Sequence, residues 1–321
     1  MILVVAEQRE GKLNRASWEA IAAAQQLAGG MPIKIAVLGG TTGSVANELA
    51  SAQVAEVLVG EHAALEPYTP DAFVSALQAL VEEQKPQFVA LPHTYQTRDF
   101  APALAARMRK ALITDITGIK GTGAGATLSR PMFQGKLTAE VKAQGDAPHF
   151  VTFQIGAFRA DAVQKGGSAT VTKTTMNVDA SKVRQKPDAP FQEARQAVDL
   201  GQAERIVAVG RGIKSQENLA IVEKLAKALG AEIAASRPIC DNGWLPMERQ
   251  IGSSGQTVAP KLYIALGISG AIQHLVGMKG SRTIVAVNKD ADAPIFEVAD
   301  YGIVGDLFEI APALTAELEK S

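Results

Sequence analysis

The chain has 321 residues, which is enough for two domains of ordinary size, and its 47% hydrophobic and 20% charged residues are typical of a globular protein with an ample core. A net charge of −1 and an aromatic content of 5% argue against a nucleic-acid-binding surface. The single cysteine, Cys240, excludes an internal disulfide framework. The four histidines are scattered, so we expect no metal site.

Short apolar strands alternate with helices in the first part of the chain. The strands are predicted at 2–6, 33–38, 57–59 and 88–91, and the helices at 16–28 and 70–83. Strands that are apolar throughout, rather than alternating, are typical of a buried parallel sheet. From about residue 113 to residue 153 the pattern changes to β-rich segments with fewer helix signals.

The segment GTGAGA, at residues 121–126, formally satisfies the glycine fingerprint of dinucleotide-binding proteins. However, β-forming residues follow it instead of a helix, so we interpret it as a hairpin turn. A polar stretch from 160 to about 197 is interpreted as an exposed connection between domains.

The α/β alternation then restarts, with strands predicted at 205–209, 232–235, 262–266 and 283–287. Helices are predicted at 216–229 and 308–320. The sequence therefore predicts an α/β protein with two domains, 1–190 and 191–321, the second with a mostly parallel sheet of flavodoxin or Rossmann type.

The most informative stretch is residues 262–288. It predicts an apolar strand, a tight Ser-Gly turn, a short helix and a second apolar strand that ends on Asn288. Open α/β sheets present backbone amides to a phosphate in this way. The turn also carries Gln273 and His274, polar side chains that a purely structural helix does not need. This stretch therefore indicates a bound nucleotide-type cofactor.

Two arginines follow predicted strands of the same domain. Arg211 lies between two glycines, and Arg237 is held in an extended conformation by Pro238. Arg211, at the carboxyl end of a parallel strand, is well placed to meet a phosphate, although an exposed surface role explains either arginine equally well. A long loop rich in Gly and Ser, residues 241–260, is typical of functional loops, whereas Cys240 is interpreted as a packed residue.

The second half of the chain contains the segments LYIALGISGAIQHLVG, TIVAVN, GRG, ASRPICDNGWLP and APIFEVADYGIVGDLFEI. Through these segments it resembles the alpha subunit of electron transfer flavoprotein. The resemblance is close from about Glu204 onward and looser before it. It implies one FAD, held mainly by the second domain. The residues that match the family's flavin-nucleotide contacts are Arg211, Ser236, Arg237, Ile251, Gly252, Ser253, Ser254, Ser269, Gly270, Ala271, Ile272, Gln273, His274, Asn288, Asp306 and Leu307.

The resemblance also implies roles for some of these residues. His274 would lie at flavin N1 and the C2 carbonyl, where it would donate a hydrogen bond or lend positive charge, and Arg237 would lie over one ring face. Ser254 stands where many members have the threonine near flavin N5, which keeps the hydroxyl, and Ser253 replaces their glutamine. The amides of residues 269–271 would take the pyrophosphate.

The function implied is that of an electron carrier rather than an enzyme with small-molecule turnover. It would accept electrons from primary flavoprotein dehydrogenases onto FAD, through an anionic semiquinone. It would pass them to the respiratory chain through a membrane quinone oxidoreductase. The first domain, which has no convincing cofactor motif, would pack against a beta subunit.

Residues 1–12 lack a cationic signal region, and no apolar run approaches the roughly 20 residues of a membrane span, so we expect a cytoplasmic protein. Two alternatives stay open at this point. One is a flavin- or nicotinamide-dependent oxidoreductase acting on a small molecule, which would need an acid or base beside the cofactor. The other is an α/β nucleotide-binding regulatory module, which would be colourless.

Overall fold

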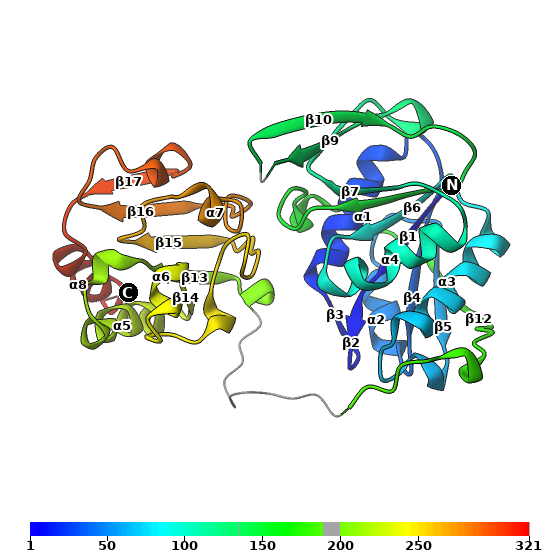
Figure 1. The fold of residues 1–321 in the computed structure, drawn as a ribbon, viewed down its shortest axis with the longest axis horizontal. Helices are drawn as coiled ribbons and strands as arrows, with labels where there is room; N and C mark the ends of the chain where they lie inside the picture. Colours follow the sequence, from blue (N-terminus) through cyan, green and yellow to red (C-terminus); the bar gives the residue numbers. More distant parts are fainter. Residues whose placement is uncertain (134, 189–199, 321) are drawn as a thin grey trace. The chain divides into compact units, whose positions relative to one another are not determined.

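The computed structural model describes residues 1–133, 135–188 and 200–320. The chain divides into two compact units, Met1–Pro190 and Phe191–Ser321. The predicted boundary, between residues 190 and 191, lies outside the described residues. Each unit is an α/β domain built around its own parallel sheet (Figure 1).

A seven-stranded sheet forms the centre of the first unit, in the order β12-β5-β4-β1-β6-β11-β7, and every neighbouring pair in it is parallel. Its strands are β1 (Ile2–Ala6), β4 (Ile33–Gly39), β5 (Glu56–Glu61), β6 (Phe88–Pro92), β7 (Leu112–Ile116), β11 (His149–Phe153) and β12 (Thr170–Thr174).

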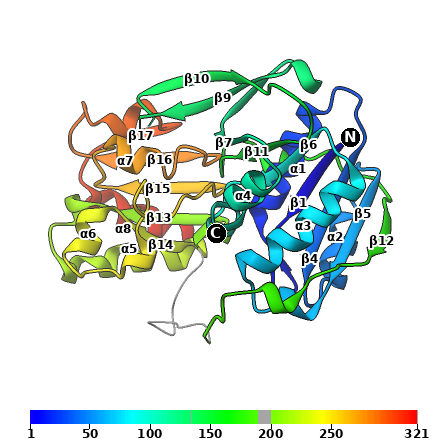
Figure 2. The same cartoon turned by 45° about the vertical axis from the view of Figure 1, so that its right-hand side comes forward.

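Helices cover both faces of this sheet: α1 (Arg15–Leu27) and α2 (Gly43–Leu49) one face, α3 (Pro70–Gln84) and α4 (Tyr95–Arg107) the other. Figure 2 shows α3 and α4 side by side. Successive side chains of β1 enter different cores, since Val4 packs with α1 and α2 and Leu3 packs with α3 and α4. Burial on both faces explains why these strands are apolar without alternation.

The β-rich segment 113–153 contributes a second, antiparallel sheet of β8 (Gly118–Lys120), β9 (Thr127–Met132) and β10 (Leu137–Lys142). A two-stranded ribbon, β2 (Gln8–Arg9) and β3 (Lys12–Leu13), lies near the start of the chain. Residues 121–126 connect the antiparallel strands β8 and β9. The interpretation of GTGAGA as a hairpin turn is therefore confirmed.

The prediction of an exposed connection over residues 160–197 was wrong for its middle part. Residues 170–174 form β12, which extends the main sheet beside β5, and Thr172 Oγ1 donates a hydrogen bond of 2.6 Å to Glu56 Oε1. Met176 and Val178 are then buried against the core. An edge strand has one neighbour and is partly solvated, so its polar sequence resembled that of a linker. Residues 189–197 of the predicted connection lie outside the described residues.

The second unit contains a five-stranded parallel sheet in the order β14-β13-β15-β16-β17. Its strands are β13 (Arg205–Val209), β14 (Glu232–Ala235), β15 (Leu262–Leu266), β16 (Ile284–Asn288) and β17 (Tyr301–Val304). The predicted strands of this unit and the fold class, α/β with a mostly parallel second sheet, are confirmed.

The two faces of this sheet are covered differently. Helices α5 (Leu219–Leu229) and α8 (Leu307–Leu318) pack on one face. The other face is covered mainly by loops, with Ile251, Val258 and Ile295 in its core. Two short helices, α6 (Arg237–Asp241) and α7 (Ile272–Leu275), follow β14 and β15. The prediction that Pro238 holds Arg237 in an extended conformation was wrong, because Arg237 is the first residue of α6 and the extended residue is its N-cap, Ser236. Among the described residues, no helix is long and apolar enough to cross a membrane.

Candidate functional site

The predicted site residues all belong to the second unit, and most lie directly after a strand. Arg211 follows β13; Ser236 and Arg237 follow β14; Ser269, Gly270, Ala271, Ile272, Gln273 and His274 follow β15; Asn288 ends β16; Asp306 and Leu307 follow β17. Residues 251–254 join them because the Ile251 N–H donates to the Ala235 carbonyl at the end of β14 (2.9 Å). Parallel strands end at the same sheet edge, so the fold brings all these segments together at the carboxyl edge.

The turn after β15 presents unpaired backbone donors. Gly270 has φ +87°, and a β-carbon there would lie 2.2 Å from the Ile295 nitrogen, so only glycine fits. The Ile295 N–H also donates to the Ser269 carbonyl at 3.1 Å, which fixes the turn. The N–H groups of Ser269, Gly270 and Ala271 donate to no other residue that the structure describes. Such a row of free amides suits an anion such as a pyrophosphate.

The predicted short helix after this turn is confirmed, but α7 has only four residues. Its macrodipole is therefore small, because the dipole comes from a sum of aligned peptide units. The attraction for an anion at this turn comes from the individual amides.

His274 has one ring nitrogen paired and one unpaired. Its side chain is buried, and Nε2 lies 2.9 Å from the Tyr263 hydroxyl. Nδ1 has no hydrogen-bond partner of ordinary geometry among the described residues. Burial lowers the pKa of His274 to about 4, although a hydrogen-bonding contact of the imidazole with the Ile251 backbone opposes this decrease. In the chain by itself the imidazole is neutral at pH 7, which favours a hydrogen-bonding role over a fixed positive charge.

The loop at residues 250–254 packs directly on α7. The Ser253 N–H donates to the Gln273 carbonyl at 2.8 Å, and a β-carbon at Gly252 would lie 2.7 Å from that same oxygen. Gln250 is 1% exposed, and its Nε2 donates to Ser254 Oγ at 3.0 Å while its Oε1 has no partner among the described residues. Since Ser254 Oγ accepts this bond, its own hydrogen is available to a ligand.

Sequence reasoning missed both Gln250 and Tyr263. Gln250 lies in the middle of the Gly/Ser-rich loop, and its burial, unexpected for a glutamine, emerges only from the fold. Tyr263 lies within an apolar strand and reads there as an ordinary core residue. A polar atom inside an apolar strand was the available signal, because a buried hydroxyl requires a partner.

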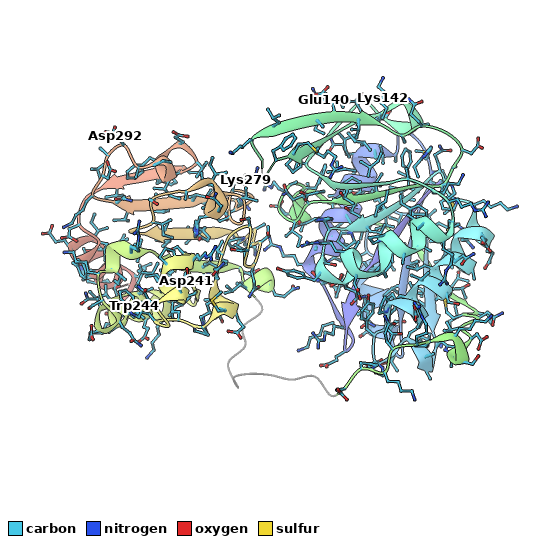
Figure 3. All side chains as sticks on the ribbon, in the orientation of Figure 1. Glu140, Lys142, Asp241, Trp244, Lys279 and Asp292 are labelled. Atoms are coloured by element: carbon cyan, nitrogen blue, oxygen red, sulfur yellow. The ribbon has the colours of Figure 1, made fainter. Side chains whose placement is uncertain are left out.

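The charged residues at this edge differ in whether they already form ion pairs or hydrogen bonds within the protein. The Arg237 side chain is 68% exposed and pairs with Asp241 on α6 (3.2 Å; Asp241 is labelled in Figure 3). Arg211 is exposed. Asp306 pairs with Lys289 at 2.7 Å and accepts the Phe308 N–H at 3.0 Å, and these two interactions lower the pKa of its carboxyl. Asp306 therefore already has a structural role as the N-cap of α8.

Asn288 is also engaged, because its Nδ2 donates to the Ile268 carbonyl at 2.9 Å. It thus connects the end of β16 with the turn after β15. The structure places Asn288 and Asp306 at the predicted edge, where both of them also support the loops around it.

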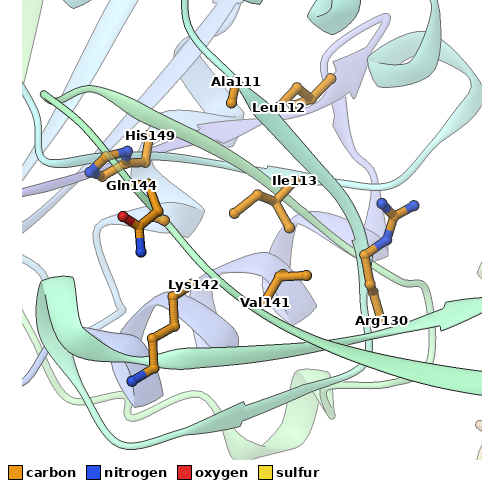
Figure 4. Close-up of a pocket in the computed structure, with 9 residues that line it drawn as sticks. Ala111, Leu112, Ile113, Arg130, Val141, Lys142, Gln144 and His149 are labelled. Atoms are coloured by element: carbon orange, nitrogen blue, oxygen red, sulfur yellow. The ribbon is translucent and has the colours of Figure 1, made fainter.

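A cavity of about 210 Å³ lies elsewhere, in the first unit (Figure 4). It is lined by apolar Leu112, Ile113 and Val141, with Arg130 and Lys142 at its margin. None of the predicted site residues lines it. Among the described residues, no group of three or more His, Cys, Asp or Glu side chains is placed to hold a metal ion.

Comparison with known proteins decides what the edge site belongs to. Residues 2–179 match the model of the electron transfer flavoprotein domain, and residues 199–279 match that of the electron transfer flavoprotein FAD-binding domain. The chain is 38% identical to the electron transfer flavoprotein subunit alpha of Bacillus subtilis over 319 residues, covering 99% of this chain and 97% of that protein. It belongs to the electron transfer flavoprotein alpha subunit family.

Other relatives agree. The electron transfer flavoprotein subunit alpha of Mycobacterium leprae is 40% identical, covering 98% of this chain and 96% of that protein. Protein FixB of Clostridium saccharobutylicum is 37% identical, covering 99% and 96%. The resemblance to electron transfer flavoprotein is thus confirmed, and so is the prediction of an electron carrier over a small-molecule oxidoreductase.

The match of residues 199–279 to the FAD-binding domain model confirms FAD as the cofactor. The edge site fits it: free amides suit the pyrophosphate, and the unpaired His274 Nδ1 and Gln250 Oε1 are polar atoms that need a ligand or water as partner. Bound FAD supplies one-electron and two-electron chemistry, and the protein supplies binding, orientation and electrostatics.

Proposed function

We propose that the sixteen predicted contact residues hold FAD at the carboxyl edge of the five-stranded sheet. We further propose that the chain accepts electrons there from primary flavoprotein dehydrogenases and delivers them to the respiratory chain through a membrane quinone oxidoreductase. The observation that supports the site best is the convergence of these residues on one edge, with His274 Nδ1 buried and unpaired among them.

Different parts of the edge would do different work. The amides of Ser269, Gly270 and Ala271 would bind the pyrophosphate, with Arg211 adding positive charge. The Ser254 hydroxyl, whose oxygen already accepts from Gln250, would donate its hydrogen to the flavin ring. Arg237, exposed after β14, would contribute positive charge over the ring and favour an added electron.

The first unit, residues 1–190, would pack against a beta subunit. The relatives are named as alpha subunits, which supports a partner of this kind. The β9–β10 hairpin offers apolar surface for it, because Phe133 and Leu137 are 69% and 60% exposed. Exposed large side chains gathered on one hairpin are typical of an interaction surface. A cytoplasmic location stays a prediction from the sequence.

The test is anaerobic, stepwise reduction of the chain co-expressed with its beta-type subunit, followed by visible absorbance. We expect a yellow complex with one FAD on this chain, reduced in two separate one-electron steps, which then reduces a quinone oxidoreductase. Direct two-electron reduction with turnover of a small molecule would contradict the carrier function. A complex that stays colourless with its partner and added FAD would refute the site itself.

A further inference from the structure

Tyr263 and His274 form a buried polar pair on the loop-covered face of the five-stranded sheet. Tyr263 is 0% exposed and His274 is 6% exposed. The Tyr263 hydroxyl lies 2.9 Å from His274 Nε2, and the two ring centroids are 6.3 Å apart. The strand β15 supplies the phenol, and α7, in the loop that leaves the same strand, supplies the imidazole.

The number of available donors and acceptors determines whether the Tyr263 hydroxyl or His274 Nε2 donates the hydrogen bond. The Tyr263 hydroxyl has His274 Nε2 as its one partner among the described residues. If Nε2 carried the proton, the hydroxyl would accept it and its own hydrogen would stay buried without an acceptor. An unsatisfied buried donor costs about 1–3 kcal/mol. The favoured arrangement is therefore that Tyr263 donates to Nε2, which places the single proton of the neutral imidazole on Nδ1.

The surroundings keep both groups neutral. Burial raises the pKa of Tyr263 far above its ordinary value, and no charged side chain contributes to that shift. Burial likewise lowers the pKa of His274, and a hydrogen-bonding contact with the Ile251 backbone is the one interaction that opposes this decrease. A phenol that does not ionise is a permanent donor to Nε2 across the physiological pH range.

We propose that Tyr263 is a positioning residue that fixes His274 as its Nδ1–H tautomer, so that a neutral imidazole donates a hydrogen bond from Nδ1 to bound FAD. The inference rests on the FAD site of the preceding subsection, because that site supplies the acceptor. The ring then needs no positive charge to serve the cofactor. Outer partners of this kind are what determine which ring nitrogen carries the proton.

The experiment reads the tautomer directly. The chain is labelled with ¹⁵N-histidine, purified with its beta-type subunit, and studied by long-range ¹H–¹⁵N NMR. The chain has four histidines, and His274→Gln assigns the signal of interest. We expect His274 to show the Nδ1–H pattern, whereas free imidazole side chains prefer Nε2–H.

The Tyr263→Phe variant removes the donor with little change of volume. We expect its His274 signal to move toward the Nε2–H pattern, and FAD to bind on the order of tenfold more weakly. The matched control is Tyr301→Phe, because Tyr301 lies in the same unit on β17 and is 66% exposed. It should leave both the tautomer and the affinity unchanged.

Two results would overturn the inference. One is an Nε2–H pattern at His274 in the wild-type complex, a measurement that does not depend on any variant folding. The other is an unchanged tautomer in Tyr263→Phe. FAD content, measured by absorbance on the same samples, separates these from a failure of the proposed function: a wild-type complex without FAD refutes both, whereas bound FAD with an Nε2–H imidazole refutes only the role of Tyr263.

Discussion

Gly212 and Gly267 lie against each other where β13 and β15 end, and neither position has room for a side chain. A β-carbon on Gly212 would lie 2.6 Å from the Gly267 α-carbon, and one on Gly267 would lie 2.7 Å from the Gly212 α-carbon. The Gly212 N–H also donates to the Gly267 carbonyl at 3.1 Å. The contact locks together the loops that carry Arg211 and Ser269, two of the proposed FAD contacts.

Gly212→Ala should therefore destabilise the second unit by about 1–3 kcal/mol, since backbone atoms cannot move aside without distorting both loops. We expect a lower unfolding midpoint of this unit and a loss of bound FAD, measured by thermal unfolding and by flavin content. Gly43→Ala is the control, because a β-carbon at Gly43 meets nothing within 4 Å. If Gly212→Ala and Gly43→Ala leave the second unit with the same unfolding midpoint, the contact between Gly212 and Gly267 does not stabilise that unit.

Arg237→Ala should lower the flavin reduction potential, because removing a cation disfavours the added electron. For one charge in a partly solvated site the change is on the order of 50 mV. Asp241→Asn should raise the potential, since Asp241 partly neutralises Arg237. Both are measured by redox titration of the complex.

Lys261→Ala is the matched control for these charge changes. Lys261 directly precedes β15 and therefore lies at the opposite edge of the sheet from the proposed flavin. Its side chain is 59% exposed and pairs with Glu204. Its removal should leave the potential unchanged. If Arg237→Ala behaves like Lys261→Ala, Arg237 does not tune the flavin.

Glu19 makes the stability of the first unit depend on pH. It is 3% exposed and accepts the Gly156 N–H at 2.6 Å. Burial raises its pKa to about 7, although the Gly156 bond and Arg15 oppose this shift. A raised pKa in the folded state contributes stability that is fully present below about pH 4.5 and is lost as the pH rises to 7. The loss amounts to at most about 3 kcal/mol.

Glu19→Gln should remove this pH dependence and make the first unit more stable than the wild type at pH 8. Denaturant unfolding at pH 5, 6, 7 and 8 measures it, with Glu48→Gln, an exposed position on α2, as the control. If the free energy of unfolding depends on pH in the same way in the wild type and in Glu19→Gln, Glu19 does not titrate between pH 5 and 8.

Arg184 fixes the chain that follows β12. Its Nε and Nη2 each donate to Asp71 at 2.9 Å, and its backbone N–H donates to Asp71 at 3.1 Å. Arg184→Ala should change the free energy of global unfolding by less than about 1 kcal/mol, because the Arg184 side chain is 81% exposed. Local opening should nevertheless make residues 175–188 several times more sensitive to limited proteolysis. Lys182→Ala, which removes only an exposed pair with Asp179, should not.

Much of the fold could be predicted from local patterns. Strands 205–209, 232–235 and 262–266 agree with β13, β14 and β15, because apolar β-rich runs bounded by glycine or polar residues leave little choice. The position of β12 could not be predicted, because a polar edge strand and a linker have the same local composition. Its pairing with β5 joins residues more than a hundred positions apart.

The sequence by itself determined the α/β class, the family and the segments that follow each strand of the second unit, because these depend on local periodicity and contiguous motifs. Only the tertiary structure decided how the site is held. The structure shows that Tyr263 contacts His274 and that Gln250 contacts Ser254. It also shows that Asp306 caps α8 and pairs with Lys289. Which buried polar atoms are satisfied, and which are left for a ligand, depends on contacts between separate loops, and no local pattern encodes those distances.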